Sequence, residues 1–156
     1  MDPCHEHEHC IDEALRQGEE ICRSSGQRFT DIRRKVLQLV WRSHKPAKAY
    51  DILEQLAEDE TGAAKPPTVY RALEFLQDNG LVHRLSSLNA FIGCTHPGKQ
   101  HQCYFLICRI CGDVSECCSS ALTRSLQNAA AQSGFTVESS CVEISGRCSR
   151  CSENPA

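Results

Sequence analysis

The sequence predicts an α+β protein in two parts: a helical N-terminal half that ends in a β-hairpin, and a small C-terminal half that mixes strands with one helix. Three observations predict this class. Apolar residues recur at helical spacing through the first half, and short strand-like runs follow them. Two Cys-x-x-Cys pairs lie in the second half. A polar segment with glycine and proline, residues 95–102, separates the halves and predicts a hinge between them.

Helical periodicity is the strongest signal in the N-terminal half. Ile32, Val36 and Val40 share one face of a predicted helix, and basic residues occupy its other faces. Pro67 suits a first helical turn, and the glycine of Asp78-Asn79-Gly80 suits a helix end. The predicted helices are residues 11–22, a segment from Ile32 that ends at Lys45-Pro46, a segment that starts near Lys48, and residues 68–76.

Two short strands follow, over residues 81–85 and 90–93. The last three of the predicted helices, followed by a two-stranded hairpin, have the element order of a winged helix-turn-helix, with residues 68–76 as its third helix. In that motif the third helix enters the major groove of DNA, and the hairpin lies against the backbone. An ordinary three-helix core with a hairpin has the same order, so this order alone leaves both interpretations open.

The C-terminal half is predicted to form a small sheet with one helix. We expect strands over residues 103–107 and 114–117, a helix over 121–131, and one or two strands within 135–144. The continuous apolar run Tyr104-Phe105-Leu106-Ile107 is typical of a strand buried on both faces. One helix cannot cover both faces of a sheet, so we expect homodimerisation through this half.

Four cysteines form two knuckles, Cys108-x-x-Cys111 and Cys148-x-x-Cys151. Each knuckle can hold two thiolates on one side of a metal ion, and two knuckles complete a tetrahedron. Tetrahedral tetrathiolate coordination is typical of closed structural zinc sites. We therefore predict a structural zinc ion bound by these four residues, which fastens the C-terminal half.

Composition narrows the class of protein further. The twelve cysteines would suit a disulfide-rich secreted protein, but the polar N-terminus lacks the apolar core of a signal peptide. Metal binding in a reducing cytoplasm is therefore the expectation. No run of about 18 apolar residues predicts a membrane span. The net charge of −3 is uneven, because only residues 27–85 carry an excess of basic over acidic side chains. That excess is too weak to prove nucleic-acid binding by itself.

Several separate motifs resemble the Fur family of metal-responsive repressors. The resemblance extends from about Arg28 to Cys151, and its narrower features point to the zinc-sensing members of the family. The motifs that carry it are Lys65-Pro66-Pro67-Thr68-Val69-Tyr70-Arg71-Ala72-Leu73, Asn79-Gly80-Leu81-Val82-His83, Leu106-Ile107-Cys108-Arg109-Ile110-Cys111-Gly112, Ala49-Tyr50-Asp51-Ile52-Leu53, and Val82-His83-Arg84 with Cys94 eleven residues beyond His83.

The resemblance implies a homodimer on a palindromic, AT-rich DNA operator, with one winged helix on each half-site. Arg71 is then the leading base reader, since a guanidinium group donates two hydrogen bonds to guanine. Tyr70 suits a thymine or phosphate contact, and Thr68 suits a phosphate at the helix N-terminus. Tyr50 suits a contact from the preceding helix, and half-buried packing is an equal alternative for it. No small-molecule substrate is expected.

The resemblance also implies a second, regulatory zinc site, and so two zinc ions per protomer. In zinc-sensing members the ligands are a histidine after the third helix, a cysteine ending the wing, and a histidine and a glutamate flanking the first knuckle. Those positions fall on His83, Cys94, His101 and Glu116. His96 and Cys103 are reserve ligands. Zinc bound by ligands from both halves would fix the separation of the two recognition helices and favour DNA binding.

These predictions together divide the chain into four segments. They are a flexible acidic tail over residues 1–10, a winged-helix domain over 11–94, a hinge over 95–102, and a dimerisation and zinc-binding domain over 103–156. The Cys4-to-Cys10 run alternates histidines with acids and could collect zinc weakly. A disordered tail without a fixed site is the preferred interpretation.

Three other functions remain open at this point. An iron or peroxide sensor of the same family is disfavoured by Cys94, because a thiolate suits zinc better than iron(II). A zinc enzyme would need an open coordination position, with Glu116 as a base rather than a ligand. A thiol oxidoreductase would need one knuckle at the start of a helix in a βαβ unit, which the sequence does not predict.

Overall fold

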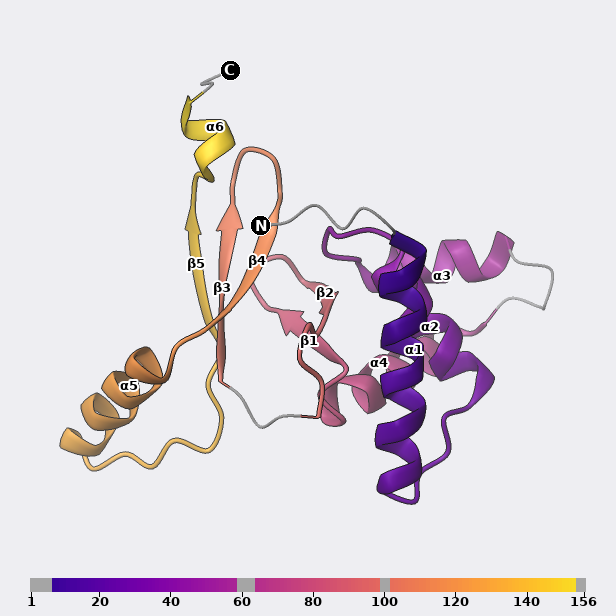
Figure 1. Ribbon diagram of the computed structural model, residues 1–156, viewed down its shortest axis with the longest axis horizontal. Helices are drawn as coiled ribbons and strands as arrows, with labels where there is room; N and C mark the ends of the chain where they lie inside the picture. The colour runs from indigo at the N-terminus through magenta and orange to yellow at the C-terminus, as the bar shows by residue number, and fades with distance from the viewer. Residues whose placement is uncertain (1–6, 59–63, 99–101, 154–156) are drawn as a thin grey trace. The chain divides into compact units, whose positions relative to one another are not determined.

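The computed structural model describes residues 7–58, 64–98 and 102–153 (Figure 1). The chain divides into two compact units, Met1–Lys99 and Gln100–Ala156, here called unit 1 and unit 2. Unit 1 is mainly helical and unit 2 is built on a sheet, which confirms the predicted α+β class. Within the described residues, no helix combines the length and apolarity needed to cross a bilayer.

The described residues of unit 1 form four helices: α1 (His7–Ser24), α2 (Asp31–Trp41), α3 (Ala49–Glu58) and α4 (Pro66–Asp78). The first begins at His7, so residues 7–10 are helical although the sequence predicts a flexible tail there. Cys10 extends the stripe formed by the buried Ala14, Gly18 and Cys22, which recur every four residues. Residues 1–6 of the predicted tail lie outside the described residues.

The core of unit 1 lies where α2 packs against its neighbours. Each helix contributes one apolar stripe, and α4 buries Val69, Leu73 and Leu76 while its other face stays in solvent. The largest fully buried side chains of this core are Val36, Leu37, Val40, Ile52, Val69, Leu73, Leu76, Leu81 and Val82. Burial on one face therefore decides which residues of α4 remain available for binding.

The predicted hairpin forms, with β1 at Val82–Leu85 and β2 at Ala90–Gly93. The strands are antiparallel, and their register pairs Val82 with Gly93 and Leu85 with Ala90. A bridge ties the hairpin to the segment before α3, because Ala47 N and Phe91 N each donate to the other residue's carbonyl oxygen at 2.8 Å. Three helices and a tethered hairpin give unit 1 the winged-helix element order.

Gly93 gives a direct test of this packing. A Cβ atom at this position would lie 2.2 Å from Cε2 of Trp41. Gly93→Ala should therefore shift the indole or the wing and destabilise unit 1 by about 1–3 kcal/mol. The measurement is urea unfolding followed by the fluorescence of Trp41, the only tryptophan.

A matched control for that substitution is Gly146→Ala in unit 2. A Cβ atom there meets nothing within 4 Å. An unchanged urea midpoint for Gly93→Ala would show that Trp41 does not pack against the wing as described.

The described part of unit 2 has a three-stranded sheet in the order β4-β3-β5 (Figure 1). Its elements are β3 (Cys103–Cys108), β4 (Val114–Cys118), α5 (Ser120–Gln132), β5 (Val142–Gly146) and α6 (Ser149–Glu153). Strand β3 pairs antiparallel with β4 and parallel with β5. The predicted strand or strands within residues 135–144 reduce to β5, because residues 135–141 form no strand. The short helix α6 was not expected from the sequence.

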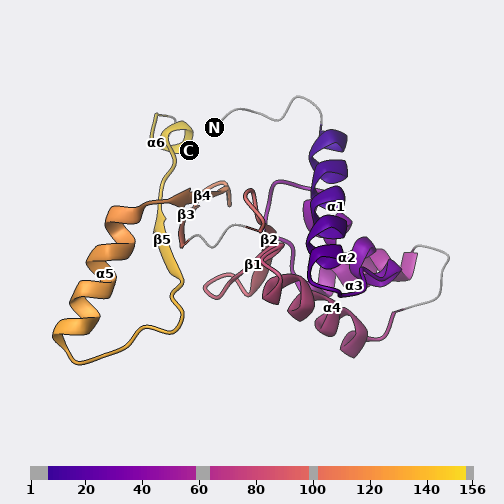
Figure 2. The ribbon, with the colours of Figure 1, turned by 60° about the horizontal axis from the view of Figure 1, so that its bottom comes forward.

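The two faces of β3 differ in burial, so the prediction of a strand buried on both faces is wrong for one chain. Phe105 and Ile107 are buried, whereas Leu106 is 41% exposed. Leu106 pairs with Ile144 of β5, which is 46% exposed, so the two side chains share an open apolar face. Helix α5 projects from one end of the sheet (Figure 1 and Figure 2) and has no buried residue. Unit 2 therefore exposes apolar surface on both sheet and helix.

Candidate metal centres and nucleic-acid interface

The first cysteine knuckle is built by the turn between β3 and β4. Cys108 ends β3, and its backbone N donates to the carbonyl oxygen of Asp113 at 2.9 Å. Gly112 N donates back to the carbonyl oxygen of Cys108 at 3.0 Å. Gly112 has φ of 75°, a left-handed conformation that favours glycine. This tight turn holds Cys108 and Cys111 on one side of the chain.

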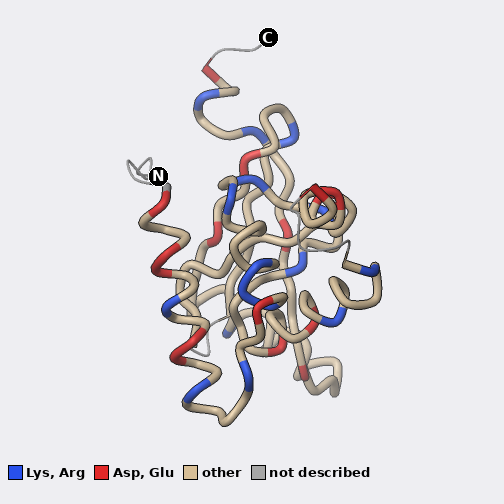
Figure 3. Tube along the Cα trace, turned by 90° about the vertical axis from the view of Figure 1, so that its right-hand side faces the viewer, with Lys and Arg blue, Asp and Glu red and all other residues tan. Residues whose placement is uncertain are grey.

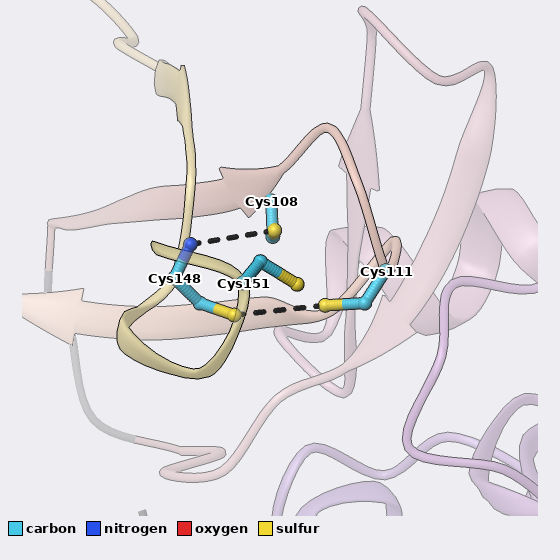
Figure 4. Close-up of side chains that lie close together, drawn as sticks. All are labelled: Cys108, Cys111, Cys148 and Cys151. Carbon is cyan, nitrogen blue, oxygen red and sulfur yellow. Dashed lines mark hydrogen bonds between the residues drawn. The ribbon is translucent and has the colours of Figure 1, made fainter. Parts of the chain in front are cut away.

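The parallel pairing of β5 with β3 brings the second knuckle to the first. Gly146 pairs with Cys108, and Arg109 N donates to the carbonyl oxygen of Gly146 at 2.9 Å. Two residues later, Cys148 N donates to Sγ of Cys108 at 3.3 Å (Figure 4). Cys151 follows on α6. The four side chains come from segments almost forty residues apart.

The four sulfur atoms have the spacing of a zinc tetrahedron. All of them lie within 4.8 Å of one another, and Sγ of Cys111 is 3.7 Å from Sγ of Cys148. A regular tetrahedron with zinc–sulfur bonds of about 2.3 Å has edges of about 3.8 Å. Figure 4 shows the sulfurs directed at a common centre. The residues present therefore fit a zinc ion bound by four thiolates.

The local environment shifts the pKa values of these thiols in opposite directions. Backbone N–H groups of Cys111, Cys148 and Ile110 lower the pKa of Cys108 to about 6. In contrast, a hydrogen bond with Cys148 and burial raise the pKa of Cys151 to about 12. Without a metal, the cluster therefore cannot hold four thiolates at neutral pH, and a bound dication would stabilise all four. Arg150 of α6 forms an ion pair with Asp113 in the turn, which links the two knuckles a second time.

Two of the predicted regulatory ligands, His83 and Cys94, lie on the wing in unit 1. The register pairs His83 with Ile92, and Cys94 N donates to the carbonyl oxygen of Leu81 at 3.0 Å, which continues the ladder beyond β2. His83 and Cys94 are therefore diagonal neighbours on one face of the hairpin, a separation that side chains can span. Cys94 is only 2% exposed.

The other two predicted regulatory ligands belong to unit 2. Glu116 lies on β4 opposite Phe105, and Sγ of Cys103 donates to Oε1 of Glu116 at 3.0 Å. The pKa of Cys103 is raised by burial and by the hydrogen bonds of its thiol with Cys118 and Glu116. His101 lies outside the described residues. Because its ligands are divided between two units, the four-residue site remains a prediction.

The exposed face of α4 carries the predicted DNA readers. Thr68, Tyr70 and Arg71 all point away from the core, and Tyr70 is 56% exposed. Tyr50 on α3 is 67% exposed, so half-buried packing does not account for it. Its hydroxyl bonds to Glu54 one turn later, which raises the pKa of Tyr50. Both helices therefore present aromatic and polar groups to solvent.

Arg71 differs from the arginines of α2 in its freedom to bind. Arg34 forms an ion pair with Glu19 of α1. Figure 3 shows in red that acidic residues recur along this helix. The guanidinium of Arg33 stacks 3.4 Å from the ring centre of Phe75. Within the described parts of the chain, Arg71 has no hydrogen-bond or ion-pair partner. Its guanidinium group is the one on α4 available to an external acceptor.

Comparison with known families decides the identity. The ferric uptake regulator family matches residues 24–145, most of the chain. This protein belongs to the ferric uptake regulator family. Members of that family are DNA-binding transcription regulators and not enzymes, so the zinc-enzyme and oxidoreductase interpretations fall away.

Within the ferric uptake regulator family, the chain is similar to zinc uptake regulators. It is 39% identical to the zinc uptake regulation protein of Escherichia coli (strain K12) over 143 residues, 90% of this chain and 82% of the relative. A zinc uptake regulator complexed with zinc and DNA matches with 38% identity and a TM-score of 0.86, covering 92% of this chain and 95% of that one. Holo XcZur matches with 41% identity and a TM-score of 0.82, covering 89% and 96%. Apo XcZur, at 40% identity and coverage of 91% and 97%, has a TM-score of 0.54.

One contact in this family member was not anticipated. Sγ of Cys103 lies 2.9 Å from Sγ of Cys118, its direct partner across β3 and β4. The sequence marks Cys103 only as a reserve ligand. The signal that could have found the pair is the register of the hairpin, because the turn at Gly112 sets which residues face each other.

Proposed function

We propose that this protein is a zinc-dependent repressor that binds operator DNA as a homodimer and controls genes for zinc uptake. The observation that carries the proposal is the exposed face of α4, where Arg71 is unpaired among the described residues. The wing follows α4 in the sequence and bears His83 and Cys94 on one face. A relative of similar sequence is complexed with both zinc and DNA, which supports the same pairing of ligands here.

Dimerisation through unit 2 follows from its exposed apolar surface. Leu106, Ile144, Leu126 and Phe135 are each at least 40% exposed, and α5 buries no side chain in one chain. A second copy would cover this surface and give the assembly a two-fold axis. Two copies of α4 would then bind the two halves of a palindromic, AT-rich operator, with Arg71, Tyr70, Thr68 and Tyr50 as contacts.

Two zinc ions per protomer would have different tasks. The closed Cys108, Cys111, Cys148 and Cys151 cluster would hold its ion permanently and stabilise unit 2. The ligands His83, Cys94, His101 and Glu116 come from both units, so an ion bound to all four would tie the wing to the dimerisation unit. Regulation would arise at this second site, because binding there fixes the separation of the two α4 helices.

The holo and apo forms of XcZur support a rearrangement between two states of such a regulator. The TM-score to this chain is 0.82 for the holo form and 0.54 for the apo form at nearly equal identity. Since both comparisons use the same two proteins, the holo and apo structures of XcZur must differ from each other. By thermodynamic linkage, any factor by which zinc raises DNA affinity is also the factor by which DNA raises zinc affinity.

Cys94→Ser tests the regulatory site. Fluorescence anisotropy on an AT-rich palindromic duplex, with free zinc buffered, should show a DNA affinity that zinc raises about 5–150-fold in the wild type. In Cys94→Ser zinc should no longer raise it, because a serine hydroxyl is a poor zinc ligand. The variant should keep its dimer and one zinc per protomer.

The matched control is Cys22→Ala, which removes another buried thiol of unit 1. It should respond to zinc like the wild type. An unchanged zinc response in Cys94→Ser would refute the regulatory ligand set. Loss of both zinc ions from that variant would refute the independence of the two sites.

A further inference from the structure

We propose that Cys103 and Cys118 form a cross-strand dithiol that hydroperoxides oxidise to a disulfide, and that this oxidation weakens zinc binding at Glu116. The first part stands on the geometry of unit 2 alone. The second part rests on the proposed function, because it takes Glu116 as a ligand of the regulatory zinc.

The hairpin register places the two cysteines at the closest kind of cross-strand position. Cys108 N bonds to Asp113 across the ladder, so Cys108 and Asp113 are a hydrogen-bonded pair. Pairs alternate along antiparallel strands, and Cys103 and Cys118 lie five steps away. They are therefore a non-hydrogen-bonded pair, in which the Cα atoms are about 4.5 Å apart and the side chains lie closest. That separation falls within the range that a disulfide spans.

The sulfur–sulfur distance separates this pair from a zinc-binding pair. Sγ of Cys103 is 2.9 Å from Sγ of Cys118, whereas Cys111 and Cys148 in the tetrathiolate cluster are 3.7 Å apart. A zinc tetrahedron needs edges of about 3.8 Å. Two thiolates at 2.9 Å are too close to share one zinc ion, while two thiols at that distance are near the bond they would form.

Solvent can reach this pair from one side. Cys118 is exposed, and Cys103 is half-buried. Cys118 lines a surface hollow together with Gln102, Ser119, Ser120, Thr123, Arg124 and Gln127. A small hydroperoxide entering the hollow therefore meets Cys118, whose Sγ is 2.9 Å from Sγ of Cys103.

The chemistry balances with a hydroperoxide as the oxidant. The Cys118 thiol gives up its proton, and the thiolate attacks the distal oxygen, so that the O–O bond breaks and Cys118 becomes a sulfenic acid. The alkoxide or hydroxide that leaves takes up the proton that the Cys118 thiol released and departs as an alcohol or water. The Cys103 sulfur then attacks the Cys118 sulfur, the S–S bond forms, and the S–O bond breaks. The departing hydroxide takes the Cys103 proton and leaves as water. Two thiols lose two electrons, and the peroxide gains them.

Glu116 links the oxidation to zinc. In the reduced pair, Cys103 donates a hydrogen bond to Oε1 of Glu116 at 3.0 Å. A disulfide has no S–H group, so oxidation removes this donor. Carboxylates that bind metals depend on such outer hydrogen bonds, and losing one weakens metal binding about 10–100-fold. Oxidation should therefore lower the zinc affinity of the regulatory site by at least about tenfold and release DNA at a fixed zinc concentration.

The first test maps the product of oxidation. The full-length dimer with its structural zinc is treated with hydrogen peroxide at low molar excess, digested and analysed by mass spectrometry. We expect a linked pair of peptides that contain Cys103 and Cys118, with the loss of two hydrogens, and its reversal by a thiol reductant. A Cys118 sulfinic acid without the link, or oxidation confined to the tetrathiolate cluster, would overturn the dithiol. Cys117→Ser is the matched control, because the neighbouring residue points to the opposite face of β4 and the link should still form.

The second test separates the disulfide from the hydrogen bond. Cys103→Ser cannot form the disulfide, but its hydroxyl still donates to Glu116, so zinc affinity should stay near the wild type and no longer respond to peroxide. Cys103→Ala loses the donor and should bind the regulatory zinc about 10–100-fold more weakly even when reduced. A chromogenic chelator in competition measures both affinities. Loss of one whole zinc equivalent from Cys118→Ser would overturn the proposal, because the pair would then be a metal site.

The outcomes distinguish this inference from the proposed function. If reduced wild-type protein binds only one zinc ion per protomer, the proposed regulatory site fails, whereas the peptide link can still form. If oxidised wild-type protein carries the link and keeps its full zinc affinity, the coupling through Glu116 fails, whereas the zinc-dependent repressor stands.

Discussion

Cys111→Ser should unfold unit 2 and dissociate the dimer while unit 1 remains folded. Few side chains of unit 2 are buried, and among the described residues these are Phe105, Ile107, Cys108 and Val114. Structural zinc sites contribute apparent binding free energies of about 10–16 kcal/mol at neutral pH, as much as the whole stability of a typical domain. Removing one thiolate from the tetrahedron therefore removes most of what folds this unit.

Three measurements check that result on the purified variant. Sedimentation velocity should report a monomer, zinc analysis should report loss of the structural ion, and amide hydrogen exchange should lose protection in β3, β4 and β5. Trp41 fluorescence should stay native, because that residue lies in unit 1. Cys141→Ser is the matched control, since Cys141 is an exposed cysteine of the same unit outside the cluster. A dimer that survives in Cys111→Ser with its zinc would show that three ligands and the apolar contacts suffice.

Arg71→Ala is expected to weaken operator binding by about 1–3 kcal/mol, or roughly 5–150-fold, and to relax base preference at one position of each half-site. The guanidinium is unpaired within the described residues, so its removal breaks no internal contact and should not change stability. A dimer presents the residue twice. Competition with operator variants that differ at single base pairs measures both the loss of affinity and the loss of preference.

A control variant shows whether the effect comes from Arg71 itself or from the loss of one positive charge. Arg124→Ala removes the same charge from the exposed part of α5 in unit 2 and should leave sequence preference intact. If Arg71→Ala weakened all sequences equally and reduced the salt dependence by about one ion, Arg71 would be a phosphate contact rather than a base reader. Unchanged binding would remove α4 from the interface.

Most of unit 1 could be predicted because its signals are local. The start of α4 follows from Pro66 and Pro67, and its end from Gly80, whose φ of 68° suits glycine. The strand at Ala90–Gly93 has the predicted bounds. Helix α1 begins earlier than expected. The polar composition of residues 7–10 favours a tail, but Cys10 keeps the helical spacing of the apolar stripe, and the helix therefore includes these residues.

Unit 2 was less predictable because its elements depend on partners distant in sequence. Strand β5 forms where residues 142–146 pair with β3, whereas residues 135–141 have no pairing partner and form no strand. The exposed side of β3 also depends on context, since an apolar run does not reveal whether one or both of its faces are covered by the same chain. Helix α6 is only five residues long, below the length at which periodicity is informative.

The chemistry available to this protein can be recognised from short stretches of its sequence: two cysteine knuckles at metal-binding spacing, a helix with Thr68, Tyr70 and Arg71 off its apolar stripe, and the order of the elements. These are properties of residues close together in the chain. Which distant groups meet depends instead on how the strands pair in the folded chain. Parallel pairing of β5 with β3 brings the sulfurs of the two knuckles within 4.8 Å, and the hairpin register places Cys103 against Cys118 and Glu116. The reason is that strand register follows from the packing of whole strands, and one shifted residue would separate every such pair.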